Sequence, residues 1–106
     1  MAERGIRGAT WEHVFGLPFS TSLIKGLEIA YSQDGKTILK KRLADCRIVD
    51  GKIRLEIPSK ETFLFEGNKI AKVQIRILDP IDNEPNSRAE DFLVLDSLFT
   101  EPMKKE

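Results

Sequence analysis

The chain has 106 residues, of which 41% are hydrophobic and 32% charged, and its 17 Lys and Arg residues balance its 17 Asp and Glu residues. This composition is typical of a single globular domain, and the balanced charge argues against a nucleic acid or an anionic membrane as partner. The longest apolar run, residues 92–95, is far shorter than the ~20 residues that span a bilayer, and the single cysteine excludes an intramolecular disulfide.

The N-terminal segment, residues 1–9, contains two Arg and two Gly residues but only one large apolar side chain, Ile6. We expect it to form a flexible arm. A flexible basic segment that ends in a large aromatic side chain can dock on a neighbouring subunit, so Ile6, Arg7 and Trp11 are candidate protein-contact residues. The first strand begins at Trp11 and ends at Pro18, because proline cannot continue a ladder.

Residues 27–32 alternate between apolar and polar side chains, which predicts a strand with one buried face. The Asp-Gly pair at positions 34 and 35 then predicts a hairpin, because glycine reaches positive φ without a Cβ clash. A three-residue loop with a bulge at Gly35 points Leu39 and Leu43 inward and misplaces only Lys41. A two-residue loop would point two charges inward, so we favour the bulge. The basic run at residues 40–42 would guard a sheet edge.

A second Asp-Gly pair, at positions 50 and 51, predicts a second hairpin. A two-residue loop gives this hairpin one wholly apolar face. The pairs on that face are Ile48 with Ile53, Cys46 with Leu55, and Ala44 with Ile57.

Later elements complete the outline. Ser59 is the expected N-cap of one short helical turn near residues 60–65, and residues 71–77 alternate as a strand. A polar loop follows at residues 79–87, then a last strand at residues 89–95 that is apolar on both faces and so expected to be covered on both. Residues 101–106 form a charged tail.

These elements predict an all-β fold, an antiparallel two-sheet sandwich of about seven strands that occupies residues 10–100 as a single domain. Its outline is immunoglobulin-like, although the paired cysteines of immunoglobulins are absent. A small β-barrel is the competing fold, and periodicity does not separate the two.

No catalytic, cofactor-binding or metal-binding constellation is present in the sequence. His13 is the only histidine, and we expect it to be half-exposed on the first strand. The register of the second hairpin points Cys46 into the core, where a thiol is inert. The acidic residues at 79–87 lack the spacing of a known calcium loop, so a solvated turn is the better interpretation.

Four segments resemble a family. They are residues 15–19 (FGLPF), 28–36 (EIAYSQDGK), 60–65 (KETFLF) and 73–76 (VQIR). In this order they resemble small proteins encoded in the structural modules of prophages of Gram-positive bacteria, which are tail- or baseplate-associated. The similarity spans roughly residues 10–78 and consists of fold-forming residues.

The resemblance implies a non-enzymatic, virion-associated protein that acts through protein–protein contacts, with itself or with other virion proteins. The residues themselves predict no cofactor, no nucleic-acid partner and no membrane partner, and the single cysteine fits synthesis in the cytoplasm. The resemblance makes this the cytoplasm of a bacterial host and adds the virion as a further location. The alternative is a small ligand- or carbohydrate-binding β-sandwich module, which would use an exposed Trp11.

Overall fold

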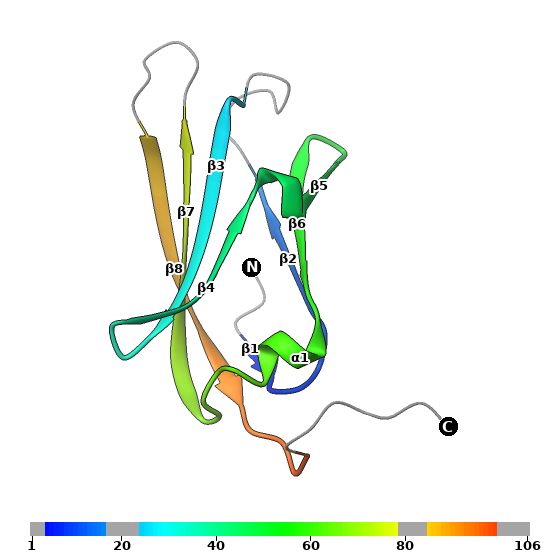
Figure 1. The fold of residues 1–106 in the computed structure, drawn as a ribbon, viewed down its shortest axis with the longest axis vertical. Helices are drawn as coiled ribbons and strands as arrows, with labels where there is room; N and C mark the ends of the chain where they lie inside the picture. The colour runs from blue at the N-terminus through cyan, green and yellow to red at the C-terminus, as the bar shows by residue number, and fades with distance from the viewer. Residues whose placement is uncertain (1–3, 17–23, 79–84, 100–106) are drawn as a thin grey trace.

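The structure, a computed structural model, describes residues 4–16, 24–78 and 85–99 (Figure 1). In these three ranges the chain forms eight strands. They are β1 (Arg4–Ile6), β2 (Trp11–Phe15), β3 (Gly26–Gln33), β4 (Lys36–Arg42), β5 (Cys46–Val49), β6 (Lys52–Ile57), β7 (Lys69–Leu78) and β8 (Pro85–Leu95). A 3-10 turn, η2 (Leu43–Asp45), precedes β5, and one helical turn, α1 (Ser59–Thr62), follows β6. The all-β prediction is confirmed.

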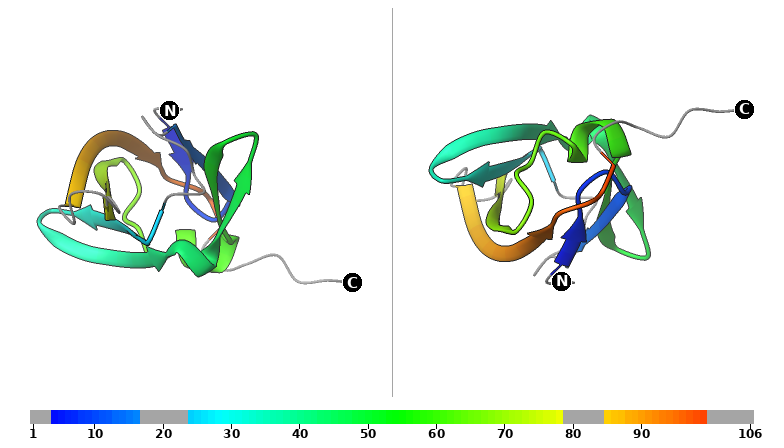
Figure 2. Two further views of the ribbon diagram at one scale, coloured as in Figure 1. Left: turned by 90° about the horizontal axis from the view of Figure 1, so that it is seen from above. Right: turned by 90° about the horizontal axis from the view of Figure 1, so that it is seen from below.

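The strands form two sheets. The larger has the order β1-β8-β7-β3-β4 and the smaller the order β2-β6-β5. Figure 2, which views the molecule from above and below, shows how the larger sheet curls. Every pair of described strands is antiparallel except β1 with β8, which is parallel and was not predicted. No helix in the described part of the chain has the length and apolar character to cross a membrane.

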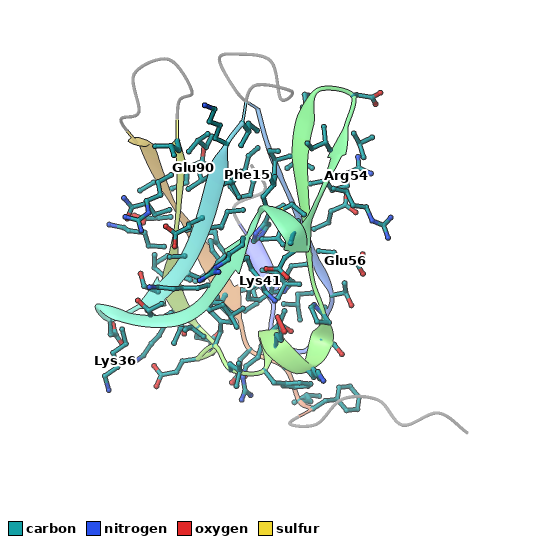
Figure 3. The ribbon with its side chains drawn as sticks, turned by 45° about the horizontal axis from the view of Figure 1, so that its top comes forward. Phe15, Lys36, Lys41, Arg54, Glu56 and Glu90 are labelled. Atoms are coloured by element: carbon teal, nitrogen blue, oxygen red, sulfur yellow. The ribbon has the colours of Figure 1, made fainter. Side chains whose placement is uncertain are left out.

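The core contains side chains from both sheets and follows the period-two patterns of the sequence. Side chains alternate between buried and exposed along β3 and β7, as predicted. In Figure 3, Phe15 points between the sheets, whereas Arg54 and Glu56 point away from β6. The fully buried larger side chains come from both sheets and from the segment after α1. They are Tyr31, Phe65, Phe92, Ile29, Ile53, Leu55, Ile57, Val73 and Val94, together with Thr62 of α1.

The loop of the first hairpin differs from the prediction. Gln33 pairs with Lys36, so the loop has two residues and not three. Asp34 and Gly35 both have positive φ, at 51° and 77°, the combination that lets a two-residue turn follow the right-handed twist of the strands. The bulge is therefore not at Gly35. The register shifts further along the hairpin, and Ile38 is the residue without a partner in the ladder.

This displaced bulge gives the facing side chains that the sequence predicted. Leu39 lies opposite Tyr31 and Lys41 opposite Ile29, so Lys41 is the inward-pointing charge. It forms an ion pair with Glu61 of α1, with Nζ 2.6 Å from Oε1 (Lys41 is labelled in Figure 3). The carboxylate of Glu61 thus compensates the charge of Lys41, the one charged side chain of β4 that the alternating pattern points toward the core.

The second hairpin has the predicted register from Cys46 to Val49. Ala44 does not pair with Ile57, because residues 43–45 form the η2 turn and β5 begins only at Cys46. Ile57 pairs with Trp11 of β2 on the other side of β6. Ile48 is 50% exposed although it lies opposite the buried Ile53, because β5 is the edge of its sheet. The predicted apolar face is therefore correct in register and only partly buried.

Two element boundaries also differ from the prediction. The N-cap of α1 is Pro58 rather than Ser59, and the helix ends at Thr62. Residues 85–87, expected in a loop, belong to β8, whose ladder with β7 continues to the pair of Pro85 with Leu78. The predictions for residues 17–22, 79–84 and 101–106 lie outside the described residues.

The segment expected to be a flexible arm contains a strand. Arg4, Gly5 and Ile6 pair with residues 93–95 of β8. Gly5 permits this approach, because a Cβ built on it would lie 2.8 Å from Cε2 of the Trp11 indole. The backbone of β1 therefore lies directly against a core aromatic ring, which composition alone did not reveal.

Gly5→Ala tests this close approach. We expect the substitution to lower the free energy of unfolding by about 1–3 kcal/mol, because the new methyl group overpacks the site beside Trp11. Gly16→Ala is the control, since a Cβ there meets nothing within 4 Å, and its effect should stay within about 0.5 kcal/mol. Urea unfolding measures both, and equal stability of the two variants would contradict the packing of β1 on Trp11.

Candidate functional site

Arg7 links the N-terminal segment to the backbone that follows α1. Its Nε donates to the carbonyl of Phe65 at 2.8 Å and its Nη2 to the carbonyl of Phe63 at 3.1 Å. The guanidinium also lies 5.4 Å from the centroid of the Phe63 ring, and Nη1 is 3.8 Å from Asp96 Oδ1. This predicted contact residue is thus engaged within its own chain.

Thr62 holds the turn after β1. Its hydroxyl accepts a hydrogen bond from the Gly8 backbone N–H at 2.9 Å. The same oxygen lies 2.8 Å from the carbonyl of Ala9, to which it donates, and 2.9 Å from that of Ser59. Thr62 is fully buried at the end of α1, so one hydroxyl satisfies backbone groups of two segments.

Trp11, the second predicted contact residue, is a core residue and only 4% exposed. Its indole Nε1 donates to the carbonyl of Ile6 at 2.8 Å. Its ring packs 4.8 Å from that of Phe65 and 5.5 Å from that of Phe92, measured between centroids. Trp11 is therefore not accessible on the surface for contact with a neighbouring subunit or a sugar.

Ile6 is the predicted contact residue that remains on the surface, at 52% exposure. It lies opposite Leu95 of β8, on the face of the sheet that points away from the core. Leu93 shares this face and pairs with Ile70 of β7, which is 56% exposed. These four residues, Ile6, Ile70, Leu93 and Leu95, form an apolar corner where β1 and β8 end and β7 begins (Figure 1).

The sequence contained a signal for the apolar corner. The last strand was predicted to be covered on both faces because it is apolar on both, and Ile70 stands at an outward position of its strand. In the described residues the inward face of β8 is buried at Phe92 and Val94, whereas Leu93 and Leu95 stay partly exposed. The outward apolar residues are therefore available for a contact.

His13 is buried, contrary to the expectation that it is half-exposed. Its Nδ1 lies 2.6 Å from the hydroxyl of Tyr31, and the two rings stack 5.5 Å apart. Burial lowers the pKa of His13 from 6.5 to about 4, and the charge of Glu90 opposes this shift. Burial also raises the pKa of Tyr31 above its ordinary range. The pair is neutral at pH 7 and joins β2 of one sheet to β3 of the other.

Cys46 lies at the start of β5 and is only partly buried. Its Sγ is 3.4 Å from the carbonyl of Arg42. Burial, followed by the charge of Asp45, raises the pKa of the thiol, which disfavours the nucleophilic thiolate. Within the ranges that the structure describes, no group of three or more His, Cys, Asp or Glu side chains is arranged to hold a metal ion.

The chain matches no protein-family model, and no curated protein matches it.

Thr62→Val tests the attachment of the N-terminal segment. The substitution keeps the shape of the side chain but leaves the Gly8 N–H and the Ala9 carbonyl without this partner, which should cost about 1–3 kcal/mol. We expect calorimetry to show a lower Tm, by roughly 4–8 °C for each kcal/mol lost. Thr37→Val, at an exposed position of β4, is the control and should leave Tm nearly unchanged. Equal Tm values for the two variants would argue against this role of Thr62.

The buried His13 predicts a specific pH dependence. Because the folded state holds His13 neutral down to about pH 4 and the unfolded chain protonates it near pH 6.5, only the unfolded state gains a proton in this window. Stability should therefore fall as the pH is lowered from 6.5 to 4, by at most about 3 kcal/mol from this residue. Urea unfolding of the wild type and of His13→Gln across this range isolates the contribution. Parallel pH profiles would refute it.

Proposed function

We propose that this chain is an immunoglobulin-like, two-sheet β-sandwich protein without catalytic activity. In this proposal it works through protein–protein contacts as a tail- or baseplate-associated component of a phage or prophage particle. Its partner is a second copy of the chain or another virion protein, and not a nucleic acid or a membrane. It is made in the cytoplasm of the bacterial host and carried into the virion.

The strand order supports the immunoglobulin-like assignment. In variable immunoglobulin domains one sheet joins strands G, F, C and C′, and the other contains B, E and D. The order β8-β7-β3-β4 follows the first arrangement and β2-β6-β5 follows the second. In immunoglobulin domains a disulfide between strands B and F links the two sheets. Here the hydrogen bond between His13 and Tyr31 links them, and it joins the strands in the B and C positions, β2 and β3.

The apolar corner is the observation that carries the contact function. Exposed apolar groups that adjoin one another on a sheet face are typical of interaction surfaces when polar residues surround them. The ion pair of Lys72 with Asp91 lies two residues along the ladder from the pair of Ile70 with Leu93, on the same face of the sheet, and supplies such a rim. Leu98 and Phe99, which follow β8, are also strongly exposed.

The resemblance of residues 10–78 to prophage structural-module proteins supports the virion location. The carbohydrate-binding alternative has less support, because it relied on an exposed Trp11 and that ring is buried. The described aromatic side chains of the core are likewise unavailable for stacking on a sugar.

Ile6→Lys and Ile70→Lys test the contact function. Light scattering should show that the wild-type chain self-associates with concentration and that each substitution shifts the particle to the monomer mass, because a charge at the corner opposes apolar burial. Ile48→Lys is the matched control, since Ile48 is 50% exposed on the other sheet, and it should keep the wild-type mass.

A wild-type chain that is monomeric at every concentration, or corner variants that associate like Ile48→Lys, would contradict the use of the corner for self-association. Point substitutions are preferable to removal of residues 1–9, because that deletion would also remove β1 and the contacts of Arg7.

A further inference from the structure

The outward face of β3 forms the floor of a shallow groove. Along β3 the outward positions carry Gly26, Glu28, Ala30 and Ser32, so every residue on this face except Glu28 is small. The neighbouring positions on β4 and β7 carry longer side chains. Arg42 and Arg76 flank Glu28 on either side, and Lys40 lies opposite Ala30. A row of short side chains thus runs between two raised walls.

Two adjoining hollows occupy this row, with volumes of about 220 Å³ and about 500 Å³. Glu28 and Arg76 line both, and Lys40 lines the first and Arg42 the second. We call the two hollows together the β3 groove. It lies on the same sheet as the apolar corner but toward the opposite end of β7, where Arg76 and Leu78 are located (Figure 1).

The charge in the groove is unbalanced. The residues that line it include three cations, Lys40, Arg42 and Arg76, and one carboxylate, that of Glu28. Arg76 Nε donates to Glu28 Oε1 at 2.9 Å, and this hydrogen bond is the main cause that lowers the pKa of Glu28. Lys40 and Arg42 act on the same carboxylate from the other side. Glu28 neutralises one of the three cations, which leaves two positive charges beside a concave surface.

From this arrangement we infer that the β3 groove binds an extended, acidic segment of a partner protein, with carboxylates of the segment paired to Lys40 and Arg42. The inference rests on the proposed function, because it assumes that the chain works through protein contacts, but it uses a different surface from the apolar corner. A guanidinium pairs with a carboxylate through two parallel hydrogen bonds, which suits Arg42 to this ligand.

The dimensions of the groove favour a peptide in extended form. Its floor follows β3 from Gly26 to Ala30, so at ~3.3 Å per residue a strand-like segment of about five residues spans it. No aromatic side chain lines either hollow, so unstacked bases have no ring to stack on. The carboxylate of Glu28, on the floor of the groove, would also repel the closely spaced negative charges of a phosphate backbone. These features favour a spaced set of carboxylates over a nucleic acid.

The basic run of β4 already has a simpler interpretation as the guard of a sheet edge, and β4 is indeed an edge strand. Edge protection explains why charges are present there. It does not explain why small side chains of β3 lie beside them, which is the observation that a bound segment accounts for.

The test is fluorescence anisotropy with a labelled eight-residue peptide of alternating Asp and Ser and a second peptide with Asn in place of Asp. The wild-type chain should bind the Asp peptide, more weakly as salt is raised, and should not bind the Asn peptide. The double variant Lys40→Gln with Arg42→Gln should weaken binding by about tenfold or more. The control, Lys36→Gln with Arg47→Gln, removes the same charge from exposed positions outside the groove and should change affinity less than twofold.

The inference is wrong if the Asp peptide does not bind, and three other results would also overturn it. Equal weakening in the two double variants would mean general charge attraction, and an unchanged affinity with increased aggregation of the groove variant would mean edge protection alone. Tighter binding of a labelled eight-nucleotide single strand than of the peptide, lost in the groove variant, would mean a nucleic-acid site.

The experiment distinguishes an error in the groove inference from an error in the proposed function, because peptide binding and self-association use different residues. Ile6→Lys and Ile70→Lys should retain peptide affinity while they lose self-association. If the peptide does not bind and self-association is intact, only the groove inference is wrong.

Discussion

A buried hydrogen bond between His13 and Tyr31 joins the two sheets, and the arrangement of the core depends on it. The bond is 2.6 Å long and lies among the rings of Trp11 and Phe92. In such an apolar environment an unpaired polar group is costly, so each of the two side chains requires the other. The hydrogen bond thus stabilises the placement of β2 against β3, and burial in this core keeps His13 neutral.

The N-terminal strand depends on this core in turn. Trp11 packs on Phe65 and Phe92 and presents its indole N–H to the carbonyl of Ile6, while Arg7 reaches the backbone beyond α1. Together these contacts hold β1 parallel to β8. The basic N-terminal segment therefore contains an edge strand of the larger sheet. Its exposed apolar side chain, Ile6, extends the apolar corner formed with β7 and β8.

The outward face of the five-stranded sheet carries two surfaces of different chemistry. The apolar corner lies where β7 begins, and the β3 groove lies toward the other end of that strand. The ion pair between Lys72 and Asp91 separates them. This division fits a chain with balanced total charge, because positive charge is concentrated in one place without a net field over the molecule.

The sequence by itself determined the strands other than β1, their inward faces and most of the hairpin registers, because alternation and the positive φ of an Asp-Gly pair act over a few neighbouring residues. Only the tertiary structure decided which surface each candidate residue would occupy. Trp11 and His13 are buried and β1 pairs with β8 through contacts between segments far apart in the chain. The apolar corner and the β3 groove arise in the same way, since each brings together side chains from three strands, and period-two patterns carry no information about which strands become neighbours.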